Sequence, residues 1–183
     1  DRSEGEIAGY RDVLQLVHAS YEAIPVNANV IMQLHKELYH YIPMEGGRWK
    51  NADNVISETY PDGTKRIRFE PVSAFETPRA MEFLCQELRE RLNKEDVEPL
   101  ILISVFILDF LSIHPFNDGN GWMARLLTLL LLYHCGFEVG RYISLEKIIK
   151  NTKERYYETL RQSSQDWHSN QNNISPWINY LLM

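Results

Sequence analysis

Residues Leu100–Leu108 read Leu-Ile-Leu-Ile-Ser-Val-Phe-Ile-Leu, and residues Leu126–Leu132 read Leu-Leu-Thr-Leu-Leu-Leu-Leu. Both stretches are apolar on nearly every face, so we predict two helices buried in the middle of the domain. Residues 114 to about 120 join them. A short loop between two buried helices has a rigid support, which is typical of a loop that carries chemistry.

Apolar residues spaced three and four apart predict further amphipathic helices. These are expected over Glu6–Tyr21, after Asn27, after Thr77-Pro78, from Ser144, over 151 to about 162, and after Ser175-Pro176. Between Gly46 and Phe75 the pattern changes to two short runs, Val55–Thr59 and Arg66–Phe69, which flank Pro61-Asp62-Gly63. This arrangement predicts a β-hairpin. The expected fold class is mainly α with one hairpin, in a single domain over residues 1–183.

The chain has 183 residues, of which 44% are hydrophobic and 24% charged, and a net charge of -6. These values are typical of one soluble globular domain, and Cys85 and Cys135 lie in apolar helical stretches where a free thiol is usually buried. An acidic chain lacks the basic face that sequence-independent nucleic-acid binding needs, and no apolar run is long enough to cross a membrane. The chain begins at Asp1 without a signal peptide, so we expect a cytoplasmic protein and a fragment of a longer chain.

The loop between the two buried helices combines four chemical features. Pro115 ends the first helix, so His114 lies at the carbonyl end of that helix. Gly119–Gly121 can turn successive amide groups toward an anion at the start of the second helix. Arg125 follows one turn later and can contact a second phosphate. Asp118 supplies the hard oxygen ligand that Mg²⁺ requires.

A base, a metal carboxylate, an amide-lined anion site and an arginine within twelve residues indicate phosphoryl or nucleotidyl transfer. The alternative is that His114 only ends a helix and that the glycines only form a tight turn. No other phosphate-binding or kinase motif is present. His35 and His40 are five residues apart and lack the glutamate of a zinc-protease helix, so we interpret them as ordinary residues.

This segment resembles the signature of the Fic family, His-x-Phe-x-Asp/Glu-Gly-Asn-Gly-Arg-x-x-Arg. The resemblance implies a mainly helical bundle that transfers AMP from ATP to a Ser, Thr or Tyr hydroxyl of a target protein. It implies His114 as general base and Asp118 as the Mg²⁺ ligand. The nucleotide-binding residues that it implies are Phe116, Asn117, Gly119, Asn120, Gly121, Arg125, Tyr156 and Tyr157.

The hairpin between Arg48 and Pro71 resembles the family's flap, which lies over the site and pairs with the target as an added strand. By this resemblance the edge that docks the target consists of Val55, Ile56, Ser57 and Glu58. The alternative is an ordinary exposed hairpin. Tyr156 and Tyr157 match a tyrosine pair that contacts adenine in relatives, although their spacing also suits core residues.

The sequence departs from the signature at Trp122, which replaces the first arginine and cannot pair with phosphate. We therefore expect reduced activity or an altered nucleotide preference, unless Trp122 simply fills the core. Ser164 stands where relatives often have an asparagine at the base pocket. Two alternatives to AMP transfer follow: transfer of another phosphate-containing group, or a nucleotide-binding regulatory module that has lost turnover.

The resemblance also implies partners. Many relatives are inhibited by a helix of pattern Ser/Thr-x-x-x-Glu-Gly/Asn that contacts the second signature arginine. Glu4-Gly5 matches only the last two positions of this pattern, so we expect the inhibitory helix upstream of the fragment or on another chain. The acceptor hydroxyl is expected on a target protein, with self-modification as an alternative. Any DNA binding is expected from a missing segment beyond the Pro176 helix.

Overall fold

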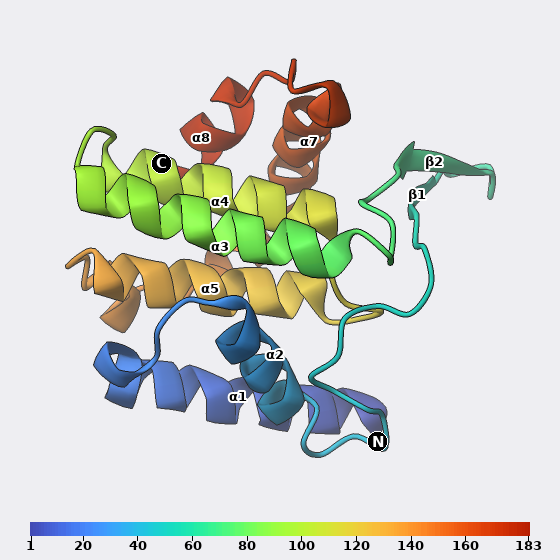
Figure 1. Cartoon of the computed structure of the whole chain (residues 1–183). Coiled ribbons are helices and arrows are strands. Elements are labelled where there is room, and N and C mark those ends of the chain that lie inside the picture. Colours follow the sequence, from blue (N-terminus) through green and yellow to red (C-terminus); the bar gives the residue numbers. More distant parts are fainter.

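The structure is a computed structural model that describes residues 1–183. It consists of eight α-helices, one two-stranded antiparallel hairpin and three short 3-10 helices (Figure 1). The helices are α1 (Arg2–Ser20), α2 (Ala28–Leu38), α3 (Thr77–Lys94), α4 (Pro99–Ile113), α5 (Asn120–His134), α6 (Leu145–Asn151), α7 (Lys153–Ser164) and α8 (Ser175–Leu181). The strands are β1 (Ile56–Thr59) and β2 (Lys65–Phe69).

The two apolar helices α4 and α5 lie at the centre of the molecule, as the sequence predicts. In Figure 1 α1 and α2 lie on one side of α5, and α7 and α8 lie beyond α4. The fully buried Leu108 and Phe110 come from α4, and Leu126, Leu127 and Leu130 come from α5. Their burial fixes the short loop between these helices at one end of the bundle.

The helix α1 approaches the bundle closely through Gly9. A Cβ atom on Gly9 would lie 2.0 Å from the carbonyl oxygen of Leu38 in α2, so no larger residue fits at this crossing. The first turn of α1 is thereby brought to the same end of the molecule as the loop between α4 and α5 (Figure 1).

The predicted hairpin projects from this same end (Figure 1). Its turn lies at Tyr60–Gly63, where the Gly63 amide donates to the Tyr60 carbonyl over 2.9 Å. The strands begin and end within a residue of the predicted runs. The helix predicted over 151 to about 162 begins two residues later, because Asn151 still belongs to α6.

Both cysteines are free thiols; Cys85 is buried as predicted, whereas Cys135, which follows the last residue of α5, is only half-buried. None of the helices combines the length and the apolar character that crossing a membrane requires.

Candidate active site

The loop between α4 and α5 begins at His114, which ends α4 in the left-handed conformation with φ of 52°. Pro115 disfavours helical geometry at the preceding residue, which explains why α4 stops here. Lys50 fixes this end of the helix, because its Nζ donates to the Ile113 carbonyl over 2.9 Å. The backbone amide of Lys50 donates to the Pro115 carbonyl over 2.8 Å. The imidazole therefore stands on a loop whose backbone is firmly held.

Two asparagines hold the rest of the loop. The buried Asn120 accepts from the Phe116 amide over 3.0 Å and donates to the Phe116 carbonyl over 2.8 Å. Asn54 donates its side-chain amide to the carbonyls of His114 and Phe116, each over 3.3 Å. Both the oxygen and the nitrogen of the Asn120 side-chain amide are thus bonded within the loop.

His35 supports the loop from α2. Its ring stacks on Phe116 with centroids 3.8 Å apart and an interplanar angle of 4°. Its Nδ1 accepts from the Gly47 amide over 2.9 Å, so its Nε2 carries the hydrogen and donates to the Asp118 carbonyl over 2.9 Å. His35 is therefore a structural residue of the loop. Its sequence spacing gave no signal of this, because each partner lies on a different segment.

His114 has the protonation state that a general base needs. Burial lowers the pKa of its imidazole to about 4, and the nearby charges of Lys50 and Arg68 lower it as well. The ring is therefore neutral near pH 7. Its Nδ1 lies 3.3 Å from the Leu111 carbonyl, which only accepts, so Nδ1 carries the hydrogen. The lone pair of Nε2 is left free to accept a proton.

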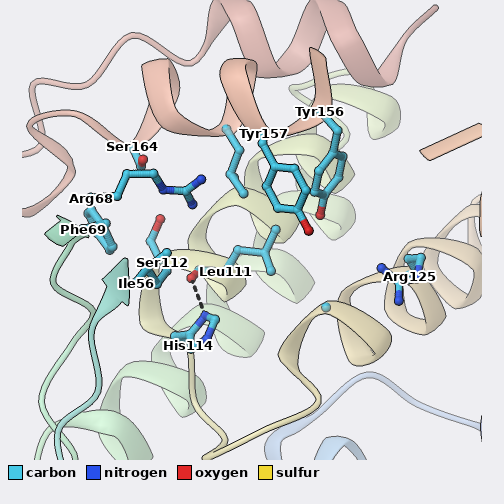
Figure 2. Close-up of a pocket in the computed structure, with 12 residues that line it drawn as sticks. Ile56, Arg68, Phe69, Leu111, Ser112, His114, Arg125, Tyr156, Tyr157 and Ser164 are labelled. Carbon is cyan, nitrogen blue, oxygen red and sulfur yellow. Dashed lines mark hydrogen bonds between the residues drawn. The ribbon is translucent and has the colours of Figure 1, made fainter. Parts of the chain in front are cut away.

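The imidazole lines a pocket of about 200 Å³ between the hairpin, the start of α5 and α7. Figure 2 shows His114 on one wall, with Tyr156 and Tyr157 opposite and Arg68 and Arg125 on different sides. A second, more open hollow of about 500 Å³ adjoins this pocket, since both include Arg68, Phe69 and Ser164. The pocket and the hollow therefore share part of their walls.

Arg125 and Gly121, both near the start of α5, form the end of the pocket suited to an anion. Gly119 starts α5 with φ of 83°, and a Cβ atom on Gly121 would lie 3.6 Å from the Arg125 guanidinium. The Nε of Arg125 is buried without a hydrogen-bond partner, and burial lowers the pKa of this guanidinium. A charged donor without a partner, beside the amino end of a helix, favours an anionic ligand.

Trp122 packs against the bundle core. Its ring centroid lies 4.5 Å from that of Tyr10 in α1, and the Arg125 guanidinium lies over the Trp122 ring, 4.6 Å from its centroid. Of the two interpretations of this position, the structure supports packing, and it adds a cation–π contact that orients Arg125.

Asp118 is half exposed at the edge of the loop and forms an ion pair with Arg2 from the first turn of α1. It fits a Mg²⁺ site of the kind that uses one carboxylate together with substrate phosphates and water. No group of three or more His, Cys, Asp or Glu side chains surrounds it, so the protein alone does not form a metal cage.

The structure brings together only part of the predicted site. The predicted site residues that line the pocket are His114, Gly121, Arg125, Tyr156, Tyr157 and Ile56. Phe116 is fully buried, Asn117 donates to Asn51 over 3.3 Å, and Asp118, Gly119 and Asn120 are not among the lining residues. Tyr156 is also a core residue, with its ring 5.4 Å from Trp177. Tyr157 is 47% exposed, so it is the tyrosine more accessible to an adenine ring.

The predicted docking edge is divided between two faces. Ile56 is half-buried and faces the pocket, whereas Val55 and Ser57 are exposed and Glu58 is half-buried outside the pocket lining. Arg68, on the neighbouring strand, lines the pocket although sequence analysis did not select it.

Comparisons with known proteins agree with this geometry. A model of the Fic/DOC family matches residues 25–132, which include the whole loop between α4 and α5. The protein adenylyltransferase Fic of Drosophila erecta is 25% identical over 181 residues, covering 96% of this chain and 31% of that protein. The protein of the same name from Drosophila melanogaster is 25% identical, with 96% and 32% covered. The chain thus spans about a third of the length of these relatives.

Solved structures show the same fold. A Fic domain containing signaling protein from Bacteroides thetaiotaomicron has a TM-score of 0.76 and 23% identity, with 98% of this chain and 67% of that chain covered. The BepC protein from Bartonella tribocorum, solved with bound AMPPNP, has a TM-score of 0.65 and 17% identity, with 99% and 86% covered. Both confirm the predicted helical fold with its hairpin.

Proposed function

Because the chain belongs to the Fic/DOC family, we propose that it transfers AMP from ATP to a Ser, Thr or Tyr hydroxyl of a target protein. One observation carries this proposal: a neutral imidazole with a free Nε2 lines the same pocket as Gly121 and the unpaired Arg125 guanidinium. A base beside an anion site is the arrangement that nucleotidyl transfer needs.

In this reaction the target oxygen attacks the α-phosphorus and the bond to the bridging oxygen breaks, so that pyrophosphate leaves. The His114 Nε2 takes the hydroxyl proton as the new bond forms. The helix amino end at Gly121 and the Arg125 guanidinium stabilise the negative charge on the phosphates. Mg²⁺ bound through Asp118 would supply further charge neutralisation between phosphates.

The relatives named as adenylyltransferases support the choice of reaction, and the relative solved with AMPPNP supports ATP as the nucleotide. For docking of the target we propose β1, because the two-stranded sheet leaves its outer edge unpaired. We propose further that the acceptor hydroxyl belongs to a target protein, with self-modification as the alternative. An inhibitory helix, by the same proposal, lies upstream of these residues or on another chain.

The test uses ATP labelled on either the α or the γ phosphate, incubated with the chain and a cell extract. Relative to extract without the chain, we expect additional covalent labelling of protein from the α label alone. His114→Ala should abolish this labelling and leave nucleotide binding within about twofold, because it removes the base and keeps the anion site. Labelling that persists in His114→Ala would contradict the assigned role, and labelling from the γ phosphate would indicate transfer of a different group.

A second candidate is a nucleotide-binding regulatory module. Two observations favour it: Trp122 holds the Arg125 guanidinium against its ring, and Arg2 is paired with the carboxylate assigned to Mg²⁺. Saturable nucleotide binding, with no label transferred from either phosphate, would establish this alternative and exclude the transferase.

A further inference from the structure

Arg68 occupies an irregular position in the hairpin. Ile56 of β1 pairs with Phe69, but the next residue, Ser57, pairs with Ile67, so Arg68 has no partner across the sheet. An extra residue of this kind is a β-bulge, and bulges commonly redirect a side chain next to an active site. The bulge turns Arg68 into the pocket that contains His114, as Figure 2 shows.

The position of Arg68 is fixed from the neighbouring 3-10 helix, Trp167–Ser169. His168 stacks on Phe69 with centroids 5.3 Å apart and donates its Nε2 hydrogen to the Glu70 carbonyl over 2.6 Å. These contacts hold the two residues that follow Arg68. The hairpin is therefore anchored at the point where the arginine enters the pocket.

The pocket contains two arginines and no acidic side chain among its lining residues. Arg68 and Arg125 also carry the two buried side-chain nitrogens of the protein that have no hydrogen-bond partner. Burial lowers the pKa of the Arg68 guanidinium; the charge of Glu58 acts in the opposite direction, yet the two residues form no ion pair. Burying an unpaired guanidinium costs free energy unless a ligand provides acceptors. Two such groups facing one pocket point to a ligand with several negative charges.

Arg68 lines the same pocket as the imidazole, and after burial and Lys50 its charge is a further cause that lowers the pKa of His114. A phosphate placed for reaction at His114 therefore lies within the field of Arg68. Arg68 also lines both the pocket and the adjoining open hollow.

We propose that Arg68 is a phosphate-contacting residue, supplied by the hairpin, which provides the second cation that Trp122 removed from the signature. This assignment rests on the proposed nucleotide site. The guanidinium would contact the reacting phosphate from the side opposite Arg125, so the hairpin takes part in nucleotide binding as well as in docking the target.

The test measures dissociation constants for a non-hydrolysable ATP analogue, AMP and adenosine in the wild-type chain and in Arg68→Gln. Loss of a charged contact to phosphate should weaken binding of the analogue by about 10- to 100-fold and weaken AMP as well. Adenosine binding should stay unchanged. Arg68→Lys keeps the positive charge but loses the planar guanidinium. Its dissociation constant for the analogue should lie between those of the wild type and of Arg68→Gln.

Arg66→Gln is the matched control, since it removes the same charge from an exposed position two residues away on β2; it should bind all three ligands as the wild type does. Thermal melting of each variant checks folding. The assignment of Arg68 is wrong if Arg68→Gln binds the analogue as tightly as Arg66→Gln does. It is also wrong if Arg68→Gln weakens adenosine binding as much as it weakens binding of the analogue. In both cases the wild-type chain still binds the nucleotide, so the proposed nucleotide site is not contradicted. If the wild type binds none of the three ligands, the proposed function fails together with the assignment.

Discussion

Asp118 illustrates how a single pair of residues can control this site. Its carboxylate is paired with Arg2, which also donates its Nε to Glu6 over 2.9 Å. Mg²⁺ must displace the guanidinium to reach the carboxylate. We predict that Arg2→Gln tightens Mg²⁺ binding a few-fold in the presence of a non-hydrolysable ATP analogue, because an exposed ion pair is a weak competitor. Titration calorimetry measures the change.

Arg11→Gln provides the control for this prediction, because Arg11 is an exposed arginine of the same helix whose ion pair, over 3.8 Å, is with Asp12 and not with a residue of the loop. Both substitutions change net charge equally. An equal gain in Mg²⁺ affinity in the two variants would show a general charge effect and would contradict a specific role for Arg2.

At the scale of elements, the loop between α4 and α5 depends on α2 through His35. In His35→Phe the stack on Phe116 persists, but the Asp118 carbonyl and the Gly47 amide lose their hydrogen-bond partner. An unsatisfied buried polar group costs about 1 to 3 kcal/mol. We predict that His35→Phe lowers the free energy of unfolding by about 2 kcal/mol, as measured by urea denaturation.

His40→Phe tests the same change at an exposed position just after α2. It should leave the free energy of unfolding within about 0.5 kcal/mol of the wild type. A His35 variant as stable as the His40 variant would mean that water satisfies both loop groups, and that α2 does not hold the loop.

Local rules explain which elements the sequence predicts well. Pro115 and Gly119 act on their own backbone, so the end of α4 and the start of α5 follow from the sequence. Lys50 and His35 act on residues more than sixty positions away, and no local pattern signals those contacts. Arg68 was missed for a third reason: alternation along a strand does not show where a bulge will lie.

At the scale of the whole molecule, the pocket joins three parts of the chain that are distant in sequence: the hairpin, the loop with the start of α5, and α7. Figure 1 shows the hairpin projecting from the bundle, where few other elements contact it. A ligand held by Arg68, Arg125 and Tyr157 would connect all three parts, so binding should stabilise the entire fold and the hairpin most of all.

We therefore predict that ATP with Mg²⁺, at about 100 times the dissociation constant, stabilises the folded chain by about 2.7 kcal/mol. For a domain of this size that corresponds to a rise in Tm of about 5 to 10 °C, measured by calorimetry. Hydrogen exchange should slow in residues 56–69 as the hairpin closes on the nucleotide.

A double variant, Arg68→Gln with Arg125→Gln, should melt at the same temperature with and without the nucleotide. A rise in Tm without added protection of the hairpin would place the nucleotide against the bundle alone, and would remove the hairpin from the binding site.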